Sequence, residues 1–125
     1  MKLKNILIVV SDIKASKEFY QELFRLRVVT DFGENVILTE GLVLQEKQSW
    51  EKLTGKAVEK YANNALLYFE ESDMDGFLKK LQQSKWEVEY VNECKENSLG
   101  QRVVRFYDPD KHMIEVKETV KISMC

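Results

Sequence analysis

Two short apolar stretches with the same continuation open the two halves of the chain. Residues 5–13, Asn-Ile-Leu-Ile-Val-Val-Ser-Asp-Ile, align with residues 66–74, Leu-Leu-Tyr-Phe-Glu-Glu-Ser-Asp-Met, at a constant offset of 61 positions. Each stretch is long enough for a buried strand, and its Asp can cap the first turn of a following helix. The repeat predicts a chain built from two copies of one supersecondary unit.

Helical spacing follows each Ser-Asp pair. The positions expected to face the core recur at this spacing: Ile13, Ser16, Phe19, Tyr20 and Leu23 in the first half, and Met74, Phe77, Leu78 and Leu81 in the second. Three strand-like runs then follow each helix, at residues 27–31, 35–39, 42–46, 87–92, 101–107 and 112–117. We therefore predict that the order strand, helix, strand, strand, strand occurs twice along the chain.

This order predicts an α+β fold of two βαβββ modules, at about residues 1–47 and 64–119. The connecting segment, residues 48–63, carries Trp50. It is either a surface connection held in place by one aromatic residue, or a loop that contains a short helix or carries part of the function. Each helix covers one face of its sheet, and two half-sheets placed edge to edge curl around a shared concave space. Such a space is the natural place for a small ligand.

Composition narrows the classes of partner. The 125 residues suffice for a single domain, and 19 basic side chains oppose 21 acidic ones. Without a basic excess we expect no nucleic acid partner, and apolar runs of at most five residues predict no membrane span. The N-terminal residues lack the pattern of a signal peptide, so we expect a cytoplasmic protein. Cys94 and Cys125 have no metal-type spacing and are expected to be free thiols.

Two motifs carry a family resemblance. The first is the stretch from Ile6 to Ile13 followed by Phe19-Tyr20-Gln21-Glu22-Leu23-Phe24, and the second is the stretch from Arg105 to Val116. Both resemble the vicinal oxygen chelate superfamily of glyoxalases, bleomycin-resistance proteins and extradiol dioxygenases. The resemblance covers nearly the whole chain. It implies a curved mixed sheet around a central cavity and a homodimer. Members of the superfamily include lyases, epimerases, dioxygenases, thiol transferases and drug-sequestering proteins, so the reaction stays open.

The resemblance also implies where metal ligands would stand. The family's ligand positions fall on Asn5, on Leu66, near Gln45 and on Glu115. Only Glu115 keeps a usual ligand type, because a Leu side chain binds no metal and amide oxygens are weak ligands for transition ions. We therefore predict no metal and no other cofactor. If a divalent ion did bind, its ligands would be Glu115 with Asn5 and Gln45.

Strand alternation groups other candidate residues around Glu115. Met113, Glu115 and Lys117 share one face, whereas only one of Arg102 and Arg105 can face inward, where it would neutralise Glu115 or bind an anion. Tyr68 and Trp50 offer aromatic surface. His112 is expected to be a solvent-exposed turn residue. The predicted ligand-binding residues are Glu115, Asn5, Tyr68, Gln45 and Trp50.

These observations favour metal-independent binding of a small organic molecule, aromatic or cationic, in the manner of bleomycin-resistance-type proteins. The alternative is a divalent-metal-dependent lyase, isomerase or dioxygenase centred on Glu115. A third reading is a structural or regulatory dimer with a filled interior. The sequence leaves open whether any catalysis occurs.

Overall fold

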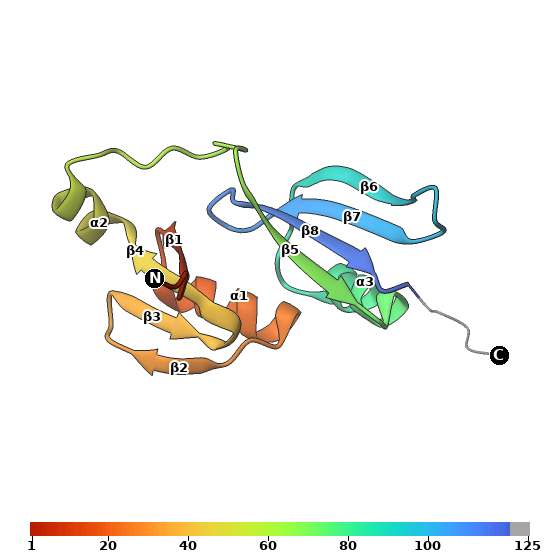
Figure 1. Ribbon diagram of the computed structural model, residues 1–125, viewed down its shortest axis with the longest axis horizontal. Helices are drawn as coiled ribbons and strands as arrows, with labels where there is room; N and C mark the ends of the chain where they lie inside the picture. Colours follow the sequence, from red (N-terminus) through yellow and green to blue (C-terminus); the bar gives the residue numbers. More distant parts are fainter. Residues whose placement is uncertain (121–125) are drawn as a thin grey trace. The chain divides into compact units, whose positions relative to one another are not determined.

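The computed structural model describes residues 1–120 and places them in two compact units, Met1–Lys60 and a second that begins at Tyr61 (Figure 1). Each unit holds one four-stranded sheet of mixed direction. Cys94 in the second unit is a free, exposed thiol, as expected. Cys125 lies outside the described residues.

The first unit contains β1 (Ile6–Val10), α1 (Ile13–Phe24), β2 (Val28–Asp31), β3 (Asn35–Leu38), the 3₁₀ turn η1 (Thr39–Gly41), β4 (Leu42–Glu46) and α2 (Lys47–Thr54). The strand order across the sheet is β1-β4-β3-β2. The strands β1 and β4 run parallel, and the other neighbours run antiparallel.

The second unit contains β5 (Leu66–Glu71), α3 (Met74–Gln83), β6 (Tyr90–Glu96), β7 (Arg102–Tyr107) and β8 (Met113–Glu118). Its strand order is β5-β8-β7-β6, with β5 parallel to β8 and the other neighbours antiparallel. The same topology therefore occurs twice, which confirms the α+β class and the two βαβββ modules.

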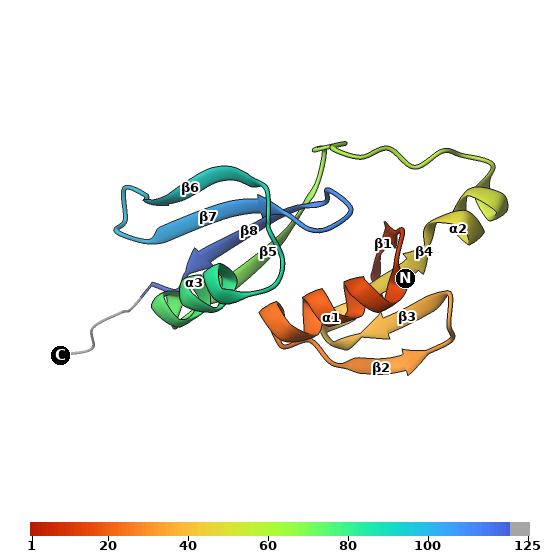
Figure 2. The same ribbon diagram turned by 180° about the vertical axis from the view of Figure 1, so that it is seen from behind.

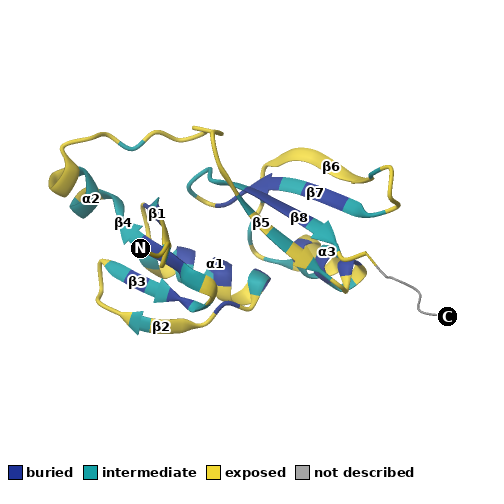
Figure 3. Ribbon diagram, in the orientation of Figure 1, coloured by how far each residue is buried: buried dark blue, intermediate teal, exposed yellow. Residues whose placement is uncertain are grey.

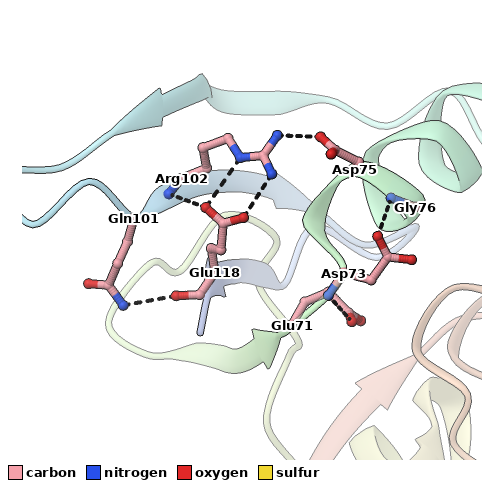
Figure 4. Close-up of polar contacts among 7 residues, drawn as sticks. All are labelled: Glu71, Asp73, Asp75, Gly76, Gln101, Arg102 and Glu118. Atoms are coloured by element: carbon pink, nitrogen blue, oxygen red, sulfur yellow. Dashed lines mark hydrogen bonds and ion pairs between the residues drawn. The ribbon is translucent and has the colours of Figure 1, made fainter. Parts of the chain in front are cut away.

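The Ser-Asp pairs begin the helices as predicted. The side chain of Asp12 accepts a hydrogen bond from the backbone N–H of Ala15 at 3.1 Å, and that of Asp73 accepts one from Gly76 at 3.0 Å. Figure 4 shows the second of these caps. Each carboxylate satisfies an N–H that has no partner within its own helix. The repeated Asp thus fixes the point at which each chain segment leaves its strand and turns into helix.

In each unit one helix, α1 or α3, covers a face of the sheet (Figure 2), and buried apolar side chains fill the layer between them. In the second unit Phe77 of α3 stacks on Phe106 of β7, with ring centroids 6.3 Å apart. Val104, Ile114 and Val116 are fully buried on the same side. Because strand side chains alternate, Arg105 and Glu115 point to the face opposite α3.

The connecting segment and the strand β6 differ from the expected elements. Residues 47–54 form α2, because the side chain of Glu46 accepts hydrogen bonds from the N–H groups of Gln48 and Ser49. Strand β6 begins at Tyr90 instead of residue 87 and continues to Glu96, since the turn that joins it to β7 spans Asn97–Gly100. Figure 3 shows β6 as an exposed edge strand. Within residues 1–120, no helix combines the length and apolar character that crossing a bilayer requires.

Candidate functional site

Four strands of the second unit each place one side chain in a single row on the face opposite α3. Tyr68 of β5 pairs with Glu115 of β8, Glu115 pairs with Arg105 of β7, and Arg105 pairs with Asn92 of β6. Directly paired residues of neighbouring strands point to the same face, so these side chains are neighbours across the sheet. The row brings two of the predicted site residues, Tyr68 and Glu115, together with Arg105.

The carboxylate of Glu115 is the most buried group of this row. Glu115 is only 8% exposed. The Nε–H of Arg105 donates to its Oε1 at 2.7 Å, and Lys117 places its Nζ 4.0 Å from Oε2. Arg105 also donates from Nη1 to the Oδ1 of Asn92 at 2.9 Å. Burying a carboxylate is costly unless it is paired and hydrogen-bonded, and Arg105 meets both needs.

The other arginine of β7 points toward α3, as alternation predicts. Arg102 donates from Nε and Nη2 to the two carboxylate oxygens of Glu118, at 3.2 and 2.7 Å, and from Nη1 to Asp75 of α3 at 2.5 Å (Figure 4). These hydrogen bonds raise the pKa of Arg102. Arg102 therefore ties α3 to its sheet. The expectation that only one of the two arginines accompanies Glu115 is confirmed, and that residue is Arg105.

Tyr68 and Lys117 lie in contact on the same face. Tyr68 is 46% exposed, and the Nζ of Lys117 lies 5.2 Å from the centroid of its ring. The hydroxyl of Tyr68 donates to Glu70 at 3.3 Å. One register step away, Leu66 pairs with Met113 and Met113 with Tyr107, which forms an apolar row beside the polar one.

The predicted ligand-binding residues Asn5 and Gln45 of the first unit form hydrogen bonds with other residues of that unit. The Nδ2 of Asn5 donates to the carbonyl of Gly41 at 3.3 Å. Gln45 accepts from Asn35 and donates to Ser49 of α2, both at 2.8 Å. Trp50 lies half-buried on α2, next to Ser49 in the chain.

Asn5 and Gln45 do not converge within the first unit. Asn5 directly precedes the first residue of β1, whereas Gln45 pairs with Val9. Val9 lies four steps along the chain from Asn5, which is ~13 Å at ~3.3 Å per residue. The register also shows which residue of the first sheet is equivalent to Glu115. Leu7 matches Tyr68 in the repeat, and Leu7 pairs with Val43. The first sheet therefore carries an apolar side chain at the position equivalent to Glu115.

His112 differs from its expected role as a solvent-exposed turn residue. It is half-buried, with its Nδ1 2.8 Å from Oδ2 of Asp108, a carboxylate whose side chain is inaccessible to solvent. Asp108 also accepts hydrogen bonds from the N–H groups of Asp110 and His112, so one carboxylate organises the whole turn. Burial of the imidazole lowers its pKa, but the hydrogen bond and charge of Asp108, with the charge of Asp110, outweigh burial and raise the pKa of His112 above 6.5.

The donor set does not fit the metal that the fold family implies. Of the positions at which the family resemblance implies metal ligands, only Glu115 is a carboxylate, and its charge is already met by Arg105 and Lys117. The matching position on β5 is Leu66. Within the described part of the chain, no three His, Cys, Asp or Glu side chains come together as a metal-binding group. An added cation at Glu115 would have to displace a guanidinium and would be repelled by an ammonium group.

Comparison with known proteins supports the fold and the family. The sequence model of the glyoxalase-like domain matches residues 3–121. A protein of unknown function from Agrobacterium tumefaciens str. C58 is 35% identical and superposes with a TM-score of 0.78, over 96% of this chain and 95% of that one. The fosfomycin resistance protein FosX from Listeria monocytogenes is 18% identical, with a TM-score of 0.73 over 96% and 94% of the two chains.

A glyoxalase-related enzyme from Fulvimarina pelagi is 19% identical, with a TM-score of 0.78 over 94% of this chain and 88% of that one. At such identities the likeness to FosX and to this enzyme shows a shared fold and no more. A search of curated proteins found no match.

The Arg105–Glu115 pair is testable by a double-mutant cycle. Arg105→Met keeps an apolar stem and removes the charge, so we expect the free energy of unfolding to fall by about 1–3 kcal/mol, because Glu115 stays buried without its main partner. Adding Glu115→Gln should recover part of this loss, since an amide is cheaper to bury than a carboxylate. Urea denaturation measures the cycle. Arg27→Met, at an exposed arginine of the first unit, is the control. Additive effects would show that the two side chains do not interact.

The raised pKa of His112 makes stability depend on pH with a defined sign. A His whose folded-state pKa lies above its unfolded value stabilises the protein fully below about pH 6.5, and this contribution is lost as the pH rises through the folded-state pKa. The unfolding free energy of the wild type, minus that of His112→Gln, should therefore decrease from acidic to alkaline pH. Urea denaturation from pH 5.5 to 8.5 measures this difference. Because His112 is the single histidine, a difference that stays constant with pH would contradict the ion pair.

Proposed function

We propose that this chain, which belongs to the glyoxalase-like domain family, binds a small organic molecule without the help of a metal ion. The binding surface is the face of the second sheet opposite α3. The observation that carries this proposal is the contact between Glu115 and Arg105, because the side chain at the family's last ligand position is committed to a guanidinium.

The same face has the features of a ligand platform. It combines a hydrogen-bonded polar row with exposed apolar surface on Leu66 and Tyr68, which are 42% and 46% exposed. A few placed polar groups beside aromatic and aliphatic surface are typical of small-molecule sites. FosX is described as a fosfomycin resistance protein, so a protein of this fold serves in resistance to a small antibiotic.

We further propose that the protein is a cytoplasmic homodimer. The edge strands β1 and β5 carry exposed apolar side chains, among them Ile6 at 54% and Leu66 at 42%. Natural proteins cover such edges, and a second copy is the usual means in symmetric oligomers. The free thiol of Cys94 agrees with a reducing compartment. Light scattering coupled to size-exclusion chromatography should give about twice the chain mass of 14.7 kDa. A species of one chain mass at micromolar concentration would contradict the dimer.

Metal analysis and ligand screening together test the proposed function. Protein purified without chelators should carry far less than one first-row metal ion per chain, and added Mn²⁺, Ni²⁺ or Zn²⁺ should not raise its melting temperature. A thermal-shift screen of small organic compounds should find stabilising ligands, because a ligand at 100 times its Kd adds about 2.7 kcal/mol of stability.

Two outcomes would oppose the proposal in different ways. Stoichiometric metal that is lost in a folded Glu115→Ala variant would favour a metal-dependent lyase, isomerase or dioxygenase. No stabilising compound in a broad screen would favour a structural or regulatory dimer with a filled interior.

A further inference from the structure

We infer that the ligand is a small organic carboxylate, held by Arg105 and Lys117 through its carboxylate and by Leu66 and Tyr68 through its apolar part. This inference rests on the proposed function and specifies the chemistry of the same surface. It replaces the sequence-based expectation of a cationic ligand, because that expectation assumed that Glu115 was available.

The charges of the face are arranged with the anion inward and the cations outward. The side chain of Glu115 is 11% exposed, whereas those of Arg105 and Lys117 are 38% and 29% exposed. A ligand that approaches the face meets the guanidinium and the ammonium group before the carboxylate. Glu115 neutralises one positive charge, and the second remains for a ligand.

Both cations keep donors that their contacts within the described residues do not use. Arg105 donates to Glu115 from Nε and to Asn92 from Nη1, which leaves Nη2. Lys117 lies 4.0 Å from Glu115, beyond hydrogen-bond distance. A carboxylate accepts hydrogen bonds at both oxygens, so it can take one donor from each residue. Asn92 and Glu115 hold the guanidinium in place before a ligand arrives, which lowers the entropic cost of binding.

The other charged side chains near this row leave the net charge of the face positive. Glu70 pairs with Lys117 in the register and accepts the hydroxyl of Tyr68. On the other side, Val103 pairs with both Lys117 and Lys95, so Lys95 points to the same face. Arg105, Lys117 and Lys95 thus oppose Glu115 and Glu70, and the face has a net positive charge.

The apolar row sets the size of the ligand. Leu66, Met113 and Tyr107 lie one register step from the polar row, which is two residues along each strand, or ~7 Å. Leu66 and Tyr68 offer the exposed apolar surface of the two rows. A carboxylate attached to one ring or a short alkyl chain spans this distance. The exposed ring of Tyr68 suits an aromatic or planar group.

A charge series on one molecular frame tests the inference. The probes are phenylacetate, phenylacetamide and 2-phenylethylamine, titrated into the full-length protein and followed by calorimetry and by ¹H–¹⁵N NMR. Phenylacetate should bind at least about tenfold more tightly than the amide, because the charge-assisted hydrogen bonds are lost with the amide. It should shift the side-chain signals of Arg105. The amine should bind more weakly than either.

Variants of one lysine supply the matched comparison. Lys117→Met keeps the stem of the side chain and should weaken phenylacetate binding about tenfold, and Lys117→Gln should do the same if the methionine variant folds poorly. Lys79→Met, at an exposed position of α3 on the other side of the sheet, should leave binding unchanged.

The outcomes separate this inference from the proposed function. Preference for the amide or the amine, or equal binding by the Lys117 and Lys79 variants, would overturn the carboxylate inference and leave small-molecule binding intact. Screening hits confined to neutral or cationic compounds would do the same. No binding by any probe, together with no hit in the broad screen, would overturn the proposed function itself.

Discussion

A single ion pair determines what the second sheet can do. Glu115 lies in a row of side chains from four strands and is 8% exposed, and its carboxylate is costly to bury without a positive partner. A metal ion is one such partner, and a guanidinium from the next strand is another. Here the register of β7 against β8 places Arg105 directly beside Glu115, and its Nε–H donates at 2.7 Å. Glu115 and Asn92 together hold the guanidinium of Arg105. The side chains of Arg105 and Lys117 are more exposed than that of Glu115, so the cations lie outside the buried carboxylate.

The duplication explains why this chemistry resides in one half only. Both units use the same topology, and an Asp cap begins the first helix of each, yet their equivalent positions have diverged. The partner of Leu7 is Val43, whereas the partner of Tyr68 is Glu115. The amides of Asn35 and Gln45 are bound to each other and to Ser49 of α2, so they stabilise the first unit. A duplicated fold can keep its architecture in both halves while the side chains on the face opposite the helix differ, because the apolar layer beneath the helix is independent of that face.

Much of the fold and part of the site follow from the sequence, for physical reasons that differ by element. The 61-residue offset and the Ser-Asp caps predict both modules. Alternation along the strand predicts that only one of Arg102 and Arg105 accompanies Glu115, and the register of β7 against β8 identifies it as Arg105. The sequence does not predict that Asn92 lies beside Arg105, because irregular pairing between β6 and β7 breaks the alternation at that point. The family resemblance puts a ligand position near Gln45, whereas pairing with β1 shows that the residue equivalent to Glu115 in the first sheet is Val43. His112 was expected to be exposed, because sequence spacing does not reveal that the buried carboxylate of Asp108 folds back onto it.

The most direct test of this account is whether a divalent cation can compete with Arg105 for Glu115. The measurement is an NMR titration of ¹⁵N-labelled protein with Mn²⁺, which broadens signals near any site it occupies, with observation of the Nε–Hε resonance of Arg105. Because Glu115 holds the guanidinium, this resonance should exchange slowly with solvent and stay sharp at one equivalent of Mn²⁺. Selective broadening of Arg105 and of the backbone signals around Glu115 at that concentration would contradict it, because it would show that the metal displaces the guanidinium.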